Sequence, residues 1–191
     1  MVAISLEKGG RINLEKEAPG LTNLHVGLGW DTRVTDGTDF DLDASLLMVN
    51  AEGKALNEKS FIFYNNRRSD CGSIEHMGDN LTGAGEGDDE VIKISLPTIP
   101  ASCERIVVAV TIHEAESRSQ NFGQVENAFI RILNADTQEE VVRYDLSEDY
   151  STQTSLIFAE LYIKDGQWRF AAKGDGFAGG LAKLLETYGL A

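Results

Sequence analysis

Carboxylate side chains gather in two short segments of this chain, and their density favours the binding of a metal cation. The first segment spans residues 31–43 and the second spans residues 78–90, and together they hold 10 of the 31 acidic residues in the sequence. Two carboxylates about 7 Å apart repel each other by roughly 2 kcal/mol at an effective dielectric of about 20. Such a cluster therefore either raises the pKa values of its members or attracts a counter-charge. Where only oxygen ligands are available, Ca²⁺ is the usual answer.

In the first segment, Asp39, Asp41 and Asp43 are spaced by two residues. On a β-strand this spacing puts all three carboxylates on one face and the intervening apolar residues on the other. We expect the apolar face to enter the core while the carboxylates line one exposed edge. The spacing also matches the first three ligands of an EF-hand loop, but Ala44 stands where the turn glycine belongs and Asn50 where the bidentate glutamate belongs. An EF-hand is therefore excluded, whereas ligation by oxygen is not.

The second segment reads GDNLTGAGEGDDE and combines glycines with oxygen-bearing side chains. Glycine permits backbone angles that turn carbonyl oxygens inward as ligands. Ca²⁺ takes about six to eight oxygens from a flexible cage, whereas Mg²⁺ prefers fewer protein ligands and retains water. The residues concerned are Gly83, Gly85 and Gly87 with Asp79, Asn80, Asp88, Asp89 and Glu90. Two alternatives stay open: a solvated polar face in the first segment and a flexible acidic surface loop in the second.

Most of the remaining sequence predicts β-strands. Apolar and polar residues alternate in VIKISL (residues 91–96) and FIRIL (residues 129–133), and turn residues separate the runs. We expect a single domain over residues 1–191, an all-β sandwich of two antiparallel sheets with short helical segments and a C-terminal helix. The predicted strands cover residues 24–30, 42–50, 61–64, 91–96, 105–113, 128–133, 140–145, 154–163 and 168–172, with a loosely held edge strand in the first 20 residues.

Two stretches predict helices. Residues 114–120 suggest one or two polar turns, and residues 181–188 place Leu181, Leu184, Leu185 and Tyr188 on one helical face. Gly189 would end that second helix, which we expect to cover one end or face of the sandwich. The glycines at 174, 176 and 179 match a dinucleotide fingerprint, but too few residues follow for a βαβ unit. We interpret them as a turn into the last helix.

Composition excludes several classes of function. The net charge of −14 argues against nucleic acid and against unaided binding to an anionic membrane. Cys71 and Cys103 form no Cys-x-x-Cys pair, so neither a thiolate zinc site nor a dithiol redox centre is expected. The N-terminal segment predicts no secretory signal, no apolar run is long enough to span a bilayer, and we expect a cytoplasmic protein. His76 and His113 are candidates for contacts behind the metal ligands.

The motifs of this chain resemble those of the TerD family of tellurite-resistance and bacterial stress proteins over nearly its whole length. The matching motifs are VGLGWD (residues 26–31), DFDLDAS (39–45), FIFYNN (61–66), HMGDNLTGAGEGDDE (76–90), NFGQVENAFIRILN (121–134), RYDLSED (143–149) and FAGGLAKLLETYG (177–189). The resemblance implies a β-sandwich that binds two Ca²⁺ ions near one end and works with other Ter-family proteins, with any membrane association indirect. It implies the ligand set Asp31, Asp39, Asp41, Asp43, Asp79, Asn80, Gly83, Gly85, Asp88, Asp89 and Glu90, with Glu126 and Asn127 nearby.

Three hypotheses follow. The first is a calcium-binding, non-enzymatic stress-response module associated with tellurite resistance. The second is a C2-like module that docks on an anionic membrane through Ca²⁺. No basic or aromatic insertion loop is evident beside the acids, which argues against this hypothesis. The third is an enzyme, such as a glycosidase with paired carboxylates, but the acids are too crowded to form one isolated pair. Tellurite reduction would need thiols, a flavin or a metal redox centre.

Overall fold

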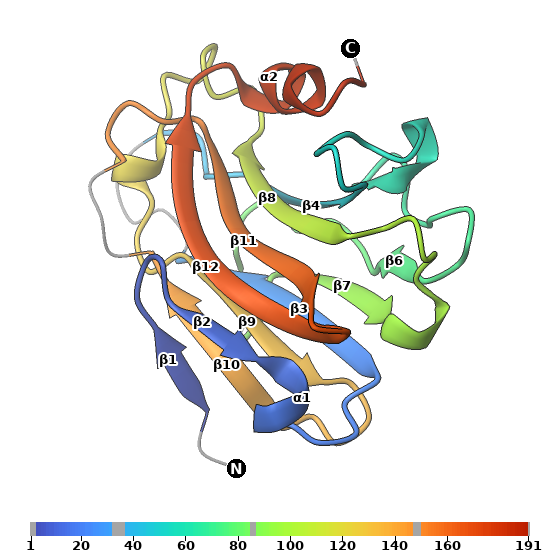
Figure 1. The fold of residues 1–191 in the computed structure, drawn as a ribbon. Coiled ribbons are helices and arrows are strands. Elements are labelled where there is room, and N and C mark those ends of the chain that lie inside the picture. Colours follow the sequence, from blue (N-terminus) through green and yellow to red (C-terminus); the bar gives the residue numbers. More distant parts are fainter. Residues whose placement is uncertain (1–2, 32–36, 85–86, 147–149, 191) are drawn as a thin grey trace.

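The computed structural model describes residues 3–31, 37–84, 87–146 and 150–190 as two six-stranded sheets packed face to face (Figure 1). Sheet A has the order β1 (Ile4–Leu6), β10 (Glu140–Asp145), β9 (Phe129–Asn134), β3 (Asn23–Gly29), β7 (Glu90–Ser95) and β6 (Ile74–His76). Sheet B has the order β2 (Arg11–Asn13), β12 (Gln167–Phe177), β11 (Ser155–Lys164), β8 (Arg105–Ile112), β4 (Leu42–Val49) and β5 (Phe61–Ile62). The predicted sandwich is confirmed.

Side-chain alternation explains how the core forms between the sheets. In β7, Ile92 and Ile94 are buried whereas Lys93 between them is exposed. In β8 and β4, both faces are buried, because one face meets sheet A and the other lies under the C-terminal helix. The continuous apolar run in β8 therefore reflects a strand covered on both sides, as its sequence predicts.

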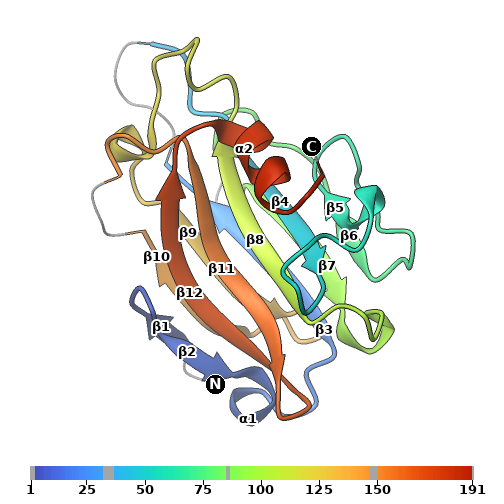
Figure 2. The same ribbon diagram turned by 45° about the horizontal axis from the view of Figure 1, so that its top comes forward.

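The C-terminal helix α2 (Gly180–Thr187) lies against the outer face of sheet B, at the top of Figure 1 and in front in Figure 2. Leu184 is buried in a cluster with Leu47 and Val107 of the sheet. Gly179 precedes the helix at φ 108° and Gly189 follows it at φ 79°, both in the left-handed region that favours glycine. The predicted position, length and end of this helix are confirmed.

Short helical segments complete the fold. They are α1 (Leu14–Glu17) and the single 3-10 turns η1 (Glu58–Ser60), η2 (Leu96–Thr98) and η3 (Phe122–Gln124). The prediction of a helix at residues 114–120 is wrong, because residues 113–119 form successive turns. Glu114 and Ser119 both have positive φ angles, which a regular helix does not accommodate.

The sheets depart from the sequence prediction at their edges. The N-terminal region supplies two edge strands rather than one, with β1 on sheet A and β2 on sheet B. β1 pairs with β10 in parallel, so sheet A is mixed and not wholly antiparallel. β12 runs to Phe177, five residues beyond its predicted end, and therefore contains Gly174 and Gly176. Only Gly179 of the three glycines lies in the turn into α2.

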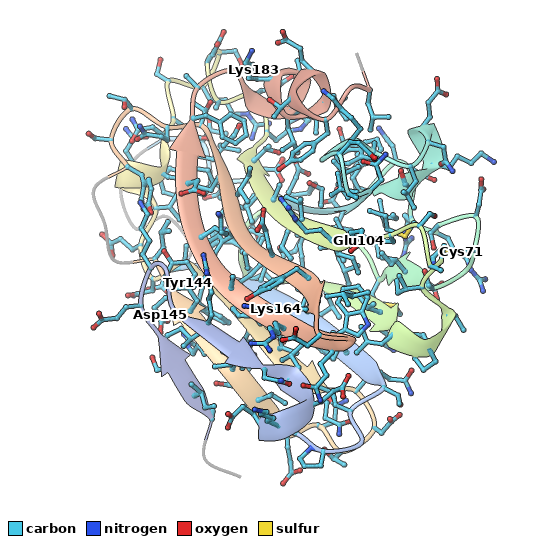
Figure 3. All side chains as sticks on the ribbon, in the orientation of Figure 1. Cys71, Glu104, Tyr144, Asp145, Lys164 and Lys183 are labelled. Carbon is cyan, nitrogen blue, oxygen red and sulfur yellow. The ribbon has the colours of Figure 1, made fainter. Side chains whose placement is uncertain are left out.

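The two cysteines form no disulfide. Cys71 is exposed and lies at the periphery of the molecule, as Figure 3 shows, whereas Cys103 is buried. No helix among the described residues is long and apolar enough to cross a membrane.

Candidate metal centre

Three aspartates from both acidic segments meet at one end of the sandwich. Asp41 directly precedes β4, and Asp43 is the second residue of that strand. Asp79 lies between β6 and β7. One carboxylate oxygen from each residue lies within 4.8 Å of the other two. β4 belongs to sheet B whereas β6 and β7 belong to sheet A, so the packing of the two sheets brings these oxygens together. The chemistry of this group is that of an all-oxygen cation site.

Burial of this cluster differs from the sequence expectation. Asp41 and Asp43 are only 6% and 8% exposed, so these carboxylates do not line an exposed edge. Asp43 is buried because both faces of β4 are covered, and Asp41 directly precedes that strand. Asp39, by contrast, is exposed and does not join the cluster.

Glu90 adds a fourth carboxylate beside the cluster. It is fully buried at the start of β7, and its Oε2 accepts a hydrogen bond of 2.6 Å from the backbone N–H of Ala44. Its Oε1 and the Oδ1 of Asp41 are buried without a hydrogen-bond partner among the described residues. A buried carboxylate oxygen without a partner is costly, and a bound cation is the kind of partner that such an atom lacks.

The electrostatics of the cluster oppose full ionisation. Burial, followed by the charges of Glu90, Asp41 and Asp79, raises the pKa of Asp43 to about 8. Burial also raises the pKa values of Asp41 and Glu90. At neutral pH the Asp43 carboxyl therefore keeps its proton unless a positive charge joins the cluster.

Basic and aromatic side chains surround the cluster at longer distances. His113 Nδ1 lies 3.8 Å from Asp43, His76 Nε2 lies 3.7 Å from Glu90, and an Arg118 nitrogen lies 3.7 Å from Asp41. Both histidines therefore lie behind the carboxylates, where the sequence allowed them. Tyr64 packs against the His113 ring, and burial together with the charges of the aspartates raises its pKa. Tyr64 and Arg118 were missed, although Tyr64 falls within the motif FIFYNN.

A second group of predicted ligands lies around Asp89. Its Oδ2 accepts a hydrogen bond from the Trp30 backbone N–H at 2.9 Å, and its Oδ1 accepts one from Asn80 Nδ2 at 3.0 Å. Burial raises the pKa of Asp89, and the charges of Asp88 and Asp31 add to that increase. Asp31 accepts a hydrogen bond of 2.6 Å from Asn127. This second group holds fewer carboxylates than the first.

Asp88 is held in an ion-pair network instead of joining the three-aspartate cluster. Arg131 Nε donates to its Oδ1 at 2.7 Å, and His25 Nε2 lies 2.9 Å from its Oδ2. Burial would raise the pKa of Asp88, but these hydrogen bonds outweigh it and lower the pKa. The carboxyl lies directly over Gly27, where a Cβ would approach it to 2.2 Å. A larger residue than glycine at position 27 would therefore displace Asp88.

Of the two predicted glycine ligands, one can be placed. Gly83 adopts φ +68°, and a Cβ there would lie 2.4 Å from Trp30 Nε1. Its N–H donates to Asn80 Oδ1 at 3.2 Å, which tightens the segment after Asp79. Gly85 lies outside the described residues.

The model of the TerD domain matches residues 2–188 of this chain. The chain belongs to the TerD family. It is 53% identical to the tellurium resistance protein TerD of Serratia marcescens, over 99% of this chain and 98% of that protein. It is also 53% identical to the general stress protein 16U of Bacillus subtilis (strain 168), over 99% of this chain and 98% of that protein. The resemblance that the motifs indicated is thus confirmed.

A solved structure shares the TerD fold. The crystal structure of a homologue of telluride resistance protein (TerD) from Streptomyces coelicolor A3(2) superposes with a TM-score of 0.71 at 24% identity, covering 90% of this chain and 99% of that chain. At this identity the similarity establishes the fold. In this member of the TerD family, the fold places Asp41, Asp43 and Asp79 where the two sheets meet.

Proposed function

We propose that this chain is a calcium-binding, non-enzymatic protein that serves tellurium resistance and the stress response through metal-dependent contacts with other proteins. Membership of the TerD family supports the biological setting. The observation that carries the calcium proposal is the convergence of Asp41, Asp43 and Asp79, with their oxygens within 4.8 Å of one another. Other Ter-family proteins in the cytoplasm are the partners that we propose.

The donor set fits Ca²⁺ better than the other biological cations. All donors are carboxylate oxygens, which hard cations prefer, and the described neighbourhood contributes no thiolate. Asp41, Asp43 and Asp79 would hold the ion, and Glu90 would contribute through its unpartnered Oε1. When bound, the ion supplies the positive charge that the buried carboxyls lack. Asp31, Asn80 and Asp89 would hold a second ion.

The geometry favours binding over hydrolysis. A glycosidase places two carboxyl groups about 5–9.5 Å apart, on either side of the bond that is cleaved. Here three carboxylate oxygens converge within 4.8 Å of one another, which is a crowded ligand cluster and not one isolated pair of carboxyl groups.

Two exposed apolar side chains flank a metal ligand and suggest where a partner binds. Met77 and Leu81, on either side of Asp79, are 44% and 58% exposed, and among the described residues the third large apolar side chain of comparable exposure is Ile163. A bound ion would fix Asp79 and with it the segment that carries both side chains. We therefore propose Met77 and Leu81 as contacts to the partner.

The same observation favours a second candidate function, calcium-dependent docking on an anionic membrane. Co-sedimentation with vesicles of phosphatidylserine and phosphatidylcholine, with Ca²⁺ or with chelator, separates the two functions. Membrane docking requires that the chain co-sediments with vesicles in Ca²⁺ and that the double variant Met77→Ser/Leu81→Ser does not. The control variant Ile163→Ser, near the hairpin between β11 and β12, should still co-sediment. Protein-partner binding leaves the chain in the supernatant with or without Ca²⁺.

Thermal unfolding of paired variants tests the calcium proposal. Ca²⁺ at a hundredfold excess over Kd stabilises a native state by about 2.7 kcal/mol. We expect Asp41→Asn to remove most of this gain and Asp88→Asn, whose carboxylate is held by Arg131, to retain it. Full calcium stabilisation in Asp41→Asn would refute the proposal.

A further inference from the structure

A cleft of about 450 Å³ opens on the outer face of sheet B, beside the metal centre. Its floor is formed by Thr111, near the end of β8, and by Thr154, which directly precedes β11. One wall is the first turn of α2, with Gly180 and Leu181, and another is the turn that follows β8. Figure 2 shows α2 lying across this end of sheet B. The volume lies within the range of about 300–1,000 Å³ that is typical of small-molecule sites.

Unpaired hydrogen-bond donors line the floor and the α2 wall. Thr111 is only 4% exposed, and its hydroxyl has no hydrogen-bond partner in the described part of the chain although it borders the cleft. The backbone N–H groups of Gly180 and Leu181 also lack partners within the described ranges, because Gly179 has no side chain to cap the helix. Helix N-termini with free N–H groups attract anions. These donors suit a carboxylate group of a ligand.

The other charged groups of the cleft suit a cation. They are Asp43, Glu114 and Glu116, accompanied by His113, and the described residues of the lining include no lysine or arginine. Glu114 is paired with Arg118 at 3.6 Å, whereas the exposed carboxylate of Glu116 has no ion pair among the described residues. The Asp43 carboxylate accepts no hydrogen bond within the described ranges, and the basic group that lies within 4 Å of it there is His113, at 3.8 Å. An ammonium group would complement this side.

We propose that the cleft binds a small zwitterion, a free amino acid or a close analogue that carries one ammonium and one carboxylate group. The carboxylate receives hydrogen bonds from Thr111 and the first turn of α2, and the ammonium faces Glu116 and Asp43. The apolar atoms of Leu181 border the space left for a side chain. This site goes beyond the proposed calcium function, because its donors lie outside the metal ligands. Asp43 borders both, so a bound zwitterion and Ca²⁺ change each other's affinity by the same factor.

The test uses the complete chain and the free standard amino acids as probes. Each is added at about 10 mM, enough to fill a site with a Kd near 1 mM, and thermal unfolding reports binding, which calorimetry then quantifies. We expect at least one amino acid to bind. Its analogues that lack either the amine or the carboxylate should bind about tenfold more weakly, because the first leaves the carboxylates of Glu116 and Asp43 unpaired and the second leaves the hydroxyl and N–H donors unpaired. If no amino acid binds, or if one analogue binds equally well, the proposal is overturned.

Two variants locate the site. Thr111→Val keeps the shape but removes the hydroxyl, and Glu116→Gln removes an exposed charge without disturbing the core. Each should weaken amino acid binding about tenfold, whereas Thr22→Val and Glu52→Gln, which are exposed and do not line the cleft, should not. Binding that Glu116→Gln and Thr111→Val leave unchanged would refute the assignment. Glu116→Gln should bind Ca²⁺ with the affinity of the wild-type chain. Failure of this proposal is therefore distinguishable from failure of the calcium proposal.

Discussion

Replacing Asp43 by Asn should stabilise the calcium-free protein, which is the opposite of the usual result for a buried polar contact. Burial and three neighbouring carboxylates raise the pKa of Asp43 from 3.8 to about 8. In the unfolded chain the carboxyl ionises near its ordinary pKa, so at pH 7 folding must return a proton to it. Each pH unit between those values costs about 1.36 kcal/mol, and about three units separate 3.8 from pH 7. Asn avoids this cost of about 4 kcal/mol.

The sign and the pH window follow from the raised pKa. Stability associated with Asp43 is fully present below pH 3.8 and is lost as the pH rises through about 8. The advantage of Asp43→Asn in chelator should therefore be absent near pH 4 and largest at pH 8. For a chain of this length, about 4 kcal/mol corresponds to an increase in Tm of about 8–16 °C at pH 7.

Thermal unfolding in chelator and in Ca²⁺, at several pH values, measures both effects. In Ca²⁺ the wild-type chain should gain stability and Asp43→Asn should gain little. Asp88→Asn is the matched control: hydrogen bonds from His25 and Arg131 lower the pKa of Asp88, so that variant should lose stability at pH 7. If Asp43→Asn is no more stable than wild type in chelator at pH 7, the electrostatic reasoning fails.

Three further outcomes are expected. Calcium binding at pH 7 should release a proton from Asp43 and weaken as the pH falls from 8 to 6, which calorimetry in buffers of different ionisation enthalpy checks; equal heats in all buffers would contradict it. Gly83→Ala should lower the free energy of unfolding by about 1–3 kcal/mol, since the φ of +68° and the close approach of Trp30 exclude a Cβ. An unchanged midpoint of chemical denaturation would count against this explanation. Leu184→Ala should lower the free energy of unfolding by about 2–5 kcal/mol, because Leu184 is buried between α2 and sheet B. A smaller loss in chemical denaturation would mean that α2 packs only weakly on the sheet.

The strands and the last helix could be predicted because their side-chain periodicity matches their burial. Ile92 and Ile94 alternate with exposed Lys93, and Leu184 and Tyr188 share the buried face of α2. The short edge strands β1 and β2 gave only a weak signal, because three residues are too few for a pattern. The turns at residues 113–119 could not be told from a helix, since polar residues suit both.

The metal centre was predictable in its chemistry but not in its grouping. Density and spacing identified Asp41, Asp43 and Asp79 as oxygen ligands, and the structure brings them together. The separation of Asp88 depends on Arg131, which is 43 residues further along the chain, and on the register between β3 and β9. No local pattern carries that information. The burial of the aspartates likewise depends on how the two sheets pack, which the spacing of residues alone does not determine.

Calorimetric titration of Ca²⁺ into chelator-stripped protein tests the central claim most directly. The account predicts micromolar or tighter binding, selective over Mg²⁺, that Asp41→Asn weakens strongly and Asp88→Asn retains. Absence of binding at millimolar Ca²⁺, or equal binding by wild type and Asp41→Asn, would contradict the assignment of the cluster formed by Asp41, Asp43 and Asp79 as a calcium site.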